Sequence, residues 1–299
     1  MSSVVYREVQ VKSALNSVKG MPFDWSLNPY SGCAHSCTYC FARAYHARYH
    51  EKNVSTDFDR NVEVRTNVAD VLRAELRRPR DGSLAIGTAT DPYQPIEGKY
   101  RLTRRCLEAL VEHPLPIGIV TKGPLVVRDI DVLKELDLRT DLTVFFSVPC
   151  VDEEIVRRTD PGTAPPRQRL RALSRLREAG IDAAVLCMPV LPGISDSEES
   201  LDAAARAASE AGATSFRHRP LKLDAEIQEY YFDFLEREFP VLVPRYTALY
   251  GGSNHPAKTY ERELEARVRR VSARYEFRER APRPRPRAEP ETVQLQLAM

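Results

Sequence analysis

The feature that most constrains the fold is a regular alternation of short apolar runs with amphipathic segments. The apolar runs have the length of β-strands, and the segments between them repeat apolar residues with the spacing of an α-helix. This order predicts an α/β fold with a parallel sheet and right-handed crossovers, and the number of repeats favours a barrel. The expected strands lie within 61–67, 83–97, 116–123, 142–150, 182–193 and 214–221, and the expected helices within 40–52, 68–78, 103–113, 128–136, 167–180, 195–212 and 226–239.

Polar residues recur where these strands end. Any one of them fits a turn or a solvated strand end equally well, but the carboxyl ends of parallel barrel strands meet on one side of the fold, where active sites lie. Their recurrence therefore predicts that they line one site. The residues are Thr88, Thr90, Asp91, Thr121, Lys122, Ser147, Cys150, Pro192, Gly193, Arg217, His218 and Arg219.

Three cysteines, Cys33, Cys37 and Cys40, form the pattern C-x3-C-x2-C, with His35 between the first two. A disulfide framework does not suit thiols so close in sequence in a reducing compartment. A structural zinc site normally takes four protein ligands, so the fourth would be His35 or a distant residue. An iron–sulfur cluster held by three thiolates leaves one iron open to another ligand. The spacing favours the cluster and leaves zinc open.

The aromatic residues that flank the last cysteine, Tyr39 and Phe41, complete a motif that resembles the radical S-adenosylmethionine (SAM) superfamily. The resemblance implies a partial (β/α)6 barrel and a 4Fe-4S cluster whose fourth iron binds SAM. It also implies reductive cleavage of SAM to a 5′-deoxyadenosyl radical that abstracts a hydrogen atom from a substrate. An electron donor such as flavodoxin or ferredoxin is then expected.

Within the superfamily the chain is similar to the spore photoproduct lyase-like branch over about residues 20 to 260. The similarity depends on the cysteine motif and on the segments TATDPYQPIE, VTKG and FFSV. It implies contacts to the SAM amino group, to its carboxylate and ribose, and to its adenine. The residues expected to make these contacts are, in that order, Thr90 and Asp91, Lys122 and Ser147, and Tyr39 and Phe41.

One position departs from that branch. The lyase has a hydrogen-donating cysteine three residues before the aspartate, where this chain has Thr88. A threonine O–H bond is much stronger than a thiol S–H bond, so spore photoproduct itself is a doubtful substrate. Cys150, at a strand end, is the expected substitute donor, with packing in the core as the alternative. For Cys187, inside a strand, packing is the favoured interpretation.

The chain of 299 residues has a formal net charge of +2, so any charged binding surface must be local. It has no stretch of eighteen apolar residues, and its first residues lack the order of a signal peptide. The expected protein is cytoplasmic, with no membrane partner.

The expected organisation is an N-terminal extension over 1–20, the barrel over 21–257, a C-terminal helix over 258–280, and a Pro/Arg-rich linker with a tail over 281–299. In the tail, Gln294, Leu297 and Met299 resemble the Q-x-x-L-x-F peptide that docks on the bacterial sliding clamp. Frayed coil is the alternative for this terminus.

These features together predict a radical SAM enzyme that abstracts hydrogen from DNA or a nucleotide, in repair or modification. Two alternatives remain open at this point. One is a radical SAM enzyme that acts on a peptide or small metabolite, and the other is a non-enzymatic zinc-binding adaptor.

Overall fold

The computed structural model describes residues 4–277, apart from 51–52, 55–56 and 79. The strands in this part of the chain are β1 (Val5–Val9), β2 (Leu15–Ser17), β3 (Trp25–Leu27), β4 (Tyr30–Ser31), β5 (Asn61–Arg65), β6 (Leu84–Ile86), β7 (Ile117–Thr121), β8 (Leu142–Ser147), β9 (Ala183–Val190) and β10 (Phe216–Pro220). The α-helices are α1 (Ala42–His50), α2 (Asp57–Arg60), α3 (Val68–Leu76), α4 (Glu97–Tyr100), α5 (Leu102–Glu112), α6 (Ile130–Arg139), α7 (Glu153–Thr159), α8 (Pro166–Glu178), α9 (Glu198–Glu210), α10 (Ala225–Glu238), α11 (Val243–Tyr250) and α12 (Lys258–Ser272). The 3₁₀ helices are η1 (Pro124–Asp129) and η2 (Pro240–Leu242).

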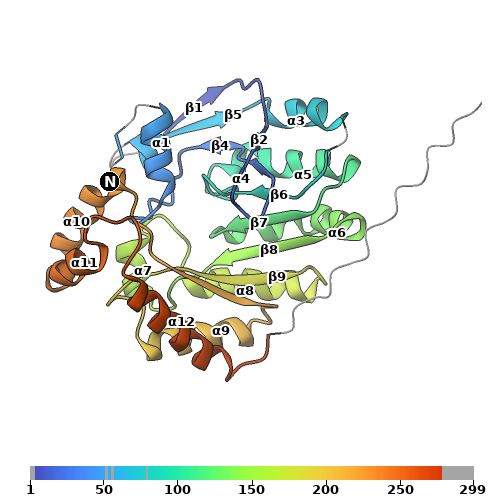
Figure 1. Cartoon of the computed structure of the whole chain (residues 1–299). Helices are drawn as coiled ribbons and strands as arrows, with labels where there is room; N and C mark the ends of the chain where they lie inside the picture. The colour runs from blue at the N-terminus through green and yellow to red at the C-terminus, as the bar shows by residue number, and fades with distance from the viewer. Residues whose placement is uncertain (1–3, 51–52, 55–56, 79, 278–299) are drawn as a thin grey trace, which may run out of the picture.

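A large sheet forms the centre of the fold. Among the described residues it has seven strands in the order β10-β9-β8-β7-β6-β3-β2. Neighbouring strands from β3 to β10 are parallel, and β2 runs antiparallel to β3. The arrowheads of β7 and β8 point to the side of the molecule that holds α1, α7 and α10 (Figure 1). This parallel sheet with its connecting helices confirms the predicted partial (β/α)6 barrel.

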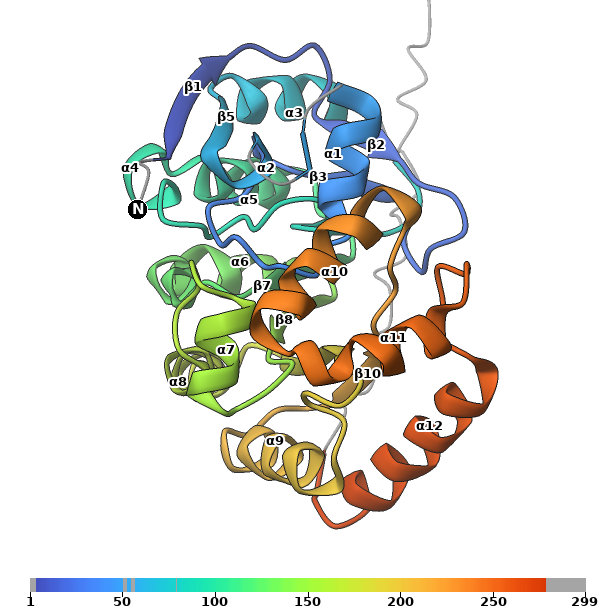
Figure 2. The same cartoon turned by 90° about the vertical axis from the view of Figure 1, so that its left-hand side faces the viewer.

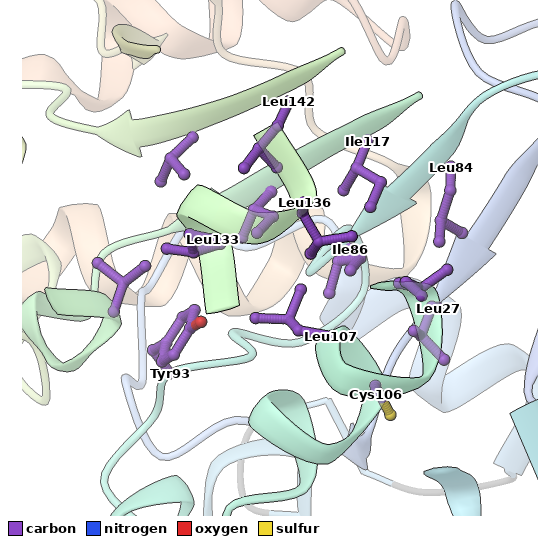
Figure 3. Packing of buried hydrophobic residues seen from close by; sticks show 14 of the residues in the cluster. Leu27, Leu84, Ile86, Tyr93, Cys106, Leu107, Ile117, Leu133, Leu136 and Leu142 are labelled. Atoms are coloured by element: carbon purple, nitrogen blue, oxygen red, sulfur yellow. The ribbon is translucent and has the colours of Figure 1, made fainter. Parts of the chain in front are cut away.

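The two faces of this sheet have different surroundings. Along β7 and β8, buried residues alternate with half-buried ones, because successive side chains of a strand point to opposite faces. The buried set, which includes Ile117 and Leu142, packs with Leu136 of α6 in the main hydrophobic core (Figure 3). Val120 and Phe145 belong to the half-buried set on the opposite face. We call this opposite face the inner face of the sheet.

Among the described residues, three further strands form a second sheet in the order β1-β5-β4. The expected strand within 61–67 is β5, which pairs with β1 and β4 in this second sheet. The first barrel strand is instead β3, which the sequence pattern did not indicate. Through β1 and β2, residues that were expected to form an N-terminal extension belong to the two sheets.

The segment after the last barrel strand returns to the start of the fold. Helix α10 packs against α1, and Figure 2 shows the two helices next to each other on the side that faces the viewer. Helix α12 packs against α9 and β10. The described part of the chain contains no helix that is both long and apolar enough to cross a membrane.

Candidate active site

The three motif cysteines lie in the loop between β4 and α1, which we call the cluster loop (residues 32–41). Cys33 and Cys37 are buried, Cys40 is half-buried, and all three thiols are free. Burial raises the pKa of Cys37 above its ordinary value, and the nearby Asp160 raises it further while Lys122 opposes the change. Three free thiols with a cation beside them suit a cluster whose ligands carry negative charge.

The zinc alternative requires several ligands around one ion. Within the described ranges, no three His, Cys, Asp or Glu side chains are grouped so that they could hold a single metal ion. Two other cysteines, Cys106 and Cys187, lie in hydrophobic clusters that do not contain the motif cysteines. The three thiols of the cluster loop are among these described side chains and are not grouped around one ion, whereas in a cluster each thiolate binds a different iron and one iron is left without a protein ligand.

The segment after β6 holds the main chain of the cluster loop. Thr90 Oγ1 donates a hydrogen bond to the carbonyl oxygen of Gly32 over 2.5 Å. Gln94 Nε2 donates to the same oxygen over 3.2 Å, and its Oε1 accepts from the amide of Ala34 over 3.0 Å. Thr90 and Gln94 are both buried. Thr90 therefore fixes the loop, and its expected contact with SAM remains a prediction.

Asp91 joins the ends of two strands to the cluster loop. Its carboxylate accepts hydrogen bonds from Thr121 Oγ1 (2.7 Å) and from the amide of Lys122 (2.6 Å), and it lies 3.2 Å from His35 Nδ1. Burial would raise the pKa of Asp91, but His35 and these hydrogen bonds lower it to about 2. Burial likewise opposes protonation of His35, but Asp91 and Cys33 raise its pKa to about 10. Both oxygens of Asp91 thus have partners within the protein, and its expected contact with the SAM amino group remains a prediction.

Lys122 and Ser147 lie side by side at the ends of β7 and β8. Lys122 Nζ donates to Ser147 Oγ over 2.9 Å, and Ser147 Oγ donates to the carbonyl oxygen of Met188 over 3.1 Å. The same ammonium lies 5.6 Å from the centre of the Tyr39 ring. The structure therefore brings three of the expected cofactor residues together. Phe41 lies differently, because 53% of it is exposed whereas Tyr39 is buried.

Two charged residues that the sequence patterns did not indicate, Asp160 and Arg169, complete this site. The Arg169 side chain is fully buried, donates to the carbonyl oxygen of Ser147 over 2.9 Å, and lies 3.7 Å from the Asp160 carboxylate. Burial raises the pKa of Tyr39, and the neighbouring Asp160 raises it further. Lys122, Arg169 and Asp160 thus place two positive charges and one negative charge next to the cluster loop.

The turn that carries Asp160 also touches the cluster loop directly. The amide of Gly162 donates to the carbonyl oxygen of His35 over 3.0 Å, and Thr38 N donates to the carbonyl oxygen of Thr159 over 2.9 Å. A Cβ atom on Gly162 would lie 2.2 Å from the carbonyl oxygen of Ala34. Only glycine allows this approach, although the sequence around it, TDPGTAPP, indicates no more than a turn.

Arg43 of α1 anchors the cluster loop from the other side, and the sequence patterns did not indicate it either. Its side chain is fully buried, and it donates to the carbonyl oxygens of Cys37 (3.0 Å) and Val54 (2.8 Å) and to Asp59 Oδ2 (2.8 Å). Its guanidinium also lies 4.7 Å from the ring centre of Tyr230 in α10. Arg43 therefore couples the loop to α10.

The structure places Cys150 after the end of β8, beside helix α9. Its Sγ lies 3.9 Å from Ser200 Oγ of α9 and accepts from the amide of Asp152, and its neighbour Cys187 belongs to the core formed with α9 and α12. Cys150 is 3% exposed, and burial raises its pKa. These contacts fit the packing alternative for this thiol, and hydrogen donation from it remains a prediction.

The C-terminal residues Gln294, Leu297 and Met299 lie outside the described part of the chain. The sliding-clamp peptide therefore stays a prediction from the sequence.

Comparisons with known proteins agree with this architecture. Residues 27–204 match the Radical SAM superfamily. An uncharacterized protein of Mycobacterium tuberculosis (strain ATCC 25618 / H37Rv) is 40% identical over 277 residues, which cover 91% of this chain and 81% of that protein. A radical SAM Nalpha-GlyT isomerase of Pseudomonas phage M6 is 26% identical over 168 residues, which cover 56% of this chain and 33% of that protein.

The fold is also that of a solved enzyme. Spore photoproduct lyase complexed with dinucleoside spore photoproduct aligns with a TM-score of 0.69 and 15% sequence identity, over 90% of this chain and 79% of the lyase. The family match covers the cluster loop, Lys122 directly after β7, and Ser147 at the end of β8. The chain belongs to the radical SAM superfamily.

Proposed function

We propose that Cys33, Cys37 and Cys40 bind a 4Fe-4S cluster and that the ends of β7 and β8 hold SAM beside it. The observation that carries this proposal is the Lys122–Ser147 pair, with Nζ and Oγ 2.9 Å apart, next to the motif residue Tyr39. A partly buried ammonium beside a hydroxyl suits the carboxylate and ribose of SAM, because a charge-assisted hydrogen bond is stronger there than in water.

Cys33, Cys37 and Cys40 would hold the cluster, which would supply the electron for reductive cleavage of SAM and so for hydrogen abstraction from the substrate. The residues of this chain bind, orient and shield the reactants. Thr90, Gln94, Asp91 and Arg43 fix the cluster loop through the contacts described above. Flavodoxin or ferredoxin is the expected electron donor.

Helix α10 supports a site that excludes water. Ile227, Tyr231 and Phe234 of α10 pack in one hydrophobic cluster with Cys37 and Tyr39 of the cluster loop. An apolar cover over this side of the loop protects a reactive radical from side reactions. These apolar residues belong to α10, which follows the last barrel strand, β10, so the chain itself connects β10 to the cofactor region.

We further propose that the substrate is DNA or a nucleotide. The solved lyase with this fold binds a dinucleoside photoproduct, and the phage relative is named as a Nalpha-GlyT isomerase. Spore photoproduct itself is not the proposed substrate, because the chain has Thr88 where the lyase has its donor cysteine and Cys150 packs against α9. Modification or repair of another nucleotide fits these residues better.

Isotope transfer tests this function. The full-length protein is reconstituted anaerobically with iron and sulfide, reduced, and incubated with SAM and oligonucleotides made from fully deuterated nucleotides. We expect deuterium in the 5′-deoxyadenosine, and none with the Cys33→Ala variant. Deuterium from labelled peptides or metabolites but from no oligonucleotide would replace the proposed substrate with the alternative class.

A further inference from the structure

One row of residues crosses the inner face of the sheet from the cofactor end to the last strand. Ser147 of β8, Leu186 of β9 and Arg217 of β10 are register partners, and Lys122 donates to Ser147. Adjacent strands lie about 4.8 Å apart, so the Cα atoms of Ser147 and Arg217 are roughly 10 Å apart. Arg217 is therefore close to the proposed SAM site without being part of it.

The neighbours of Arg217 in β10 show which face it occupies. Phe216 stacks on Phe277 with ring centres 5.9 Å apart, and His218 Nε2 lies 3.1 Å from Glu265 of α12. Both residues thus face the outer helix layer. Because side chains alternate along a strand, Arg217 lies on the inner face. The register between β10 and β9 shifts between His218 and Pro220, but exposure still alternates along β10, with Arg217 and Arg219 exposed and their neighbours half-buried, which assigns Arg219 to the same face.

A contact on the inner face agrees with this placement. The guanidinium carbon of Arg217 lies 5.6 Å from the ring centre of Phe145, a half-buried residue of β8. Arg217 and Arg219 are both exposed, and β10 is the terminal strand of the large sheet as far as the structure describes it. Two cationic side chains therefore stand at the open edge of the barrel.

Four apolar residues occupy the inner face around the row that joins these arginines to Lys122. Val120, Phe145, Leu186 and Met188 are half-buried and occupy inner-face positions of β7, β8 and β9. An apolar surface with an aromatic ring suits the flat face of a nucleic-acid base, which stacks on such residues. A guanidinium suits phosphate, because its planar fork can donate two hydrogen bonds at once.

We propose that Arg217 and Arg219 bind neighbouring phosphate groups of a single strand of nucleic acid. Residues two apart on a strand are separated by about 6.6 Å, so the two forks can reach successive phosphates. The nucleotide then lies on the surface around Phe145, with its reacting atom turned toward Lys122 and Ser147. This inference rests on the proposed function, because it places the substrate of that chemistry. A nucleotide in a duplex has to leave the base stack to reach this position.

The test measures binding of a fluorescent single-stranded oligonucleotide to the reconstituted full-length protein over a range of salt concentrations. We expect Arg217→Ala/Arg219→Ala to weaken binding, with each arginine contributing about a tenfold change in Kd. The slope of log K against log salt should fall by about 1.4, since each lost contact to single-stranded nucleic acid removes about 0.7. Arg217→Lys/Arg219→Lys should bind with intermediate affinity, because it keeps the charges and loses the forks.

A matched control removes two arginines from the outer layer. Arg269 and Arg270 of α12 are 77% and 60% exposed and pair with glutamates. Arg269→Ala/Arg270→Ala changes the net charge by the same amount, and we expect it to bind the oligonucleotide as the wild type does. Circular dichroism of all variants checks that they are folded.

The outcomes separate this inference from the proposed function. If the wild type binds the oligonucleotide and the β10 variant binds equally well, these arginines are only a solvated strand edge and the inference is wrong. If the wild type binds an acidic peptide through Arg217 and Arg219 but binds no oligonucleotide, the assignment of nucleic acid as the ligand is wrong. Failure of the wild type to cleave SAM would instead overturn the proposed function, whatever the binding data show.

Discussion

Replacing Arg43 with methionine should destabilise the protein much more than replacing an exposed arginine. Arg43 is fully buried, and its guanidinium bonds to Asp59 and to the carbonyl oxygens of Cys37 and Val54. Methionine fills much of the same space but supplies no hydrogen-bond donor. The substitution therefore leaves a largely buried carboxylate and two carbonyl groups without the donor that they share.

The expected loss in the free energy of unfolding is about 4 kcal/mol. Removing one partner of a buried ion pair typically costs about 3–5 kcal/mol, because the remaining charge stays desolvated. Asp59 also accepts from Ser36, which limits the loss. The added substitution Asp59→Asn should therefore recover about 2 kcal/mol, a coupling of the size expected for residues in direct contact.

Urea unfolding of the metal-free protein, followed by circular dichroism, measures these differences. The control is Arg139→Met on α6, where Arg139 and its partner Glu135 are about half exposed. Exposed pairs contribute little, so this variant should stay within about 0.5 kcal/mol of the wild type. A loss of less than about 1 kcal/mol for Arg43→Met, with unchanged urea dependence, would refute the view that this buried network holds the cluster loop.

Three further predictions concern the cofactor site and the tail. Lys122→Met should weaken SAM binding at least about tenfold and leave the iron content unchanged. The control Lys134→Met, on the exposed surface of α6, should change neither SAM affinity nor iron content. Loss of iron with normal SAM affinity would contradict the placement of SAM. Gly162→Ala should lower iron incorporation, because the added Cβ would lie 2.2 Å from the carbonyl oxygen of Ala34 in the cluster loop. The control Gly98→Ala should not, because the nearest atom to its Cβ would be 4.0 Å away. Equal iron content in both variants would disprove the packing argument. A fluorescent peptide of residues 292–299 should bind purified sliding clamp saturably, and no binding at high clamp concentration would rule out the tail's expected role.

Most of the barrel could be predicted because its later strands alternate with clearly amphipathic helices. The apolar runs at 116–123, 142–150 and 182–193 contain β7, β8 and β9, each long enough to show a pattern. Strand β3 has three residues, which are too few to show an alternating apolar pattern in the sequence. Strand β5 has a clear alternating pattern, but its position in the small sheet depends on pairing with β1, far away in sequence.

The candidate site was predictable only where topology determines position. Lys122 follows β7 and Ser147 ends the adjacent parallel strand β8, so their proximity could be expected from the sequence. Asp160 and Arg169 come from a turn and a helix, and only the folded chain brings them to the cluster loop. Cys150 follows Ser147 by three residues, but the chain turns there and its thiol packs against α9.

Cleavage of SAM is the measurement that tests the central claim most directly. The full-length protein, reconstituted with iron and sulfide and reduced without oxygen, is incubated with SAM, and 5′-deoxyadenosine is quantified by mass spectrometry. We predict that the wild type forms 5′-deoxyadenosine and that Cys33→Ala, Cys37→Ala and Cys40→Ala form none and lose the visible absorption of the cluster. A colourless wild-type protein that holds stoichiometric zinc and leaves SAM intact would contradict the account.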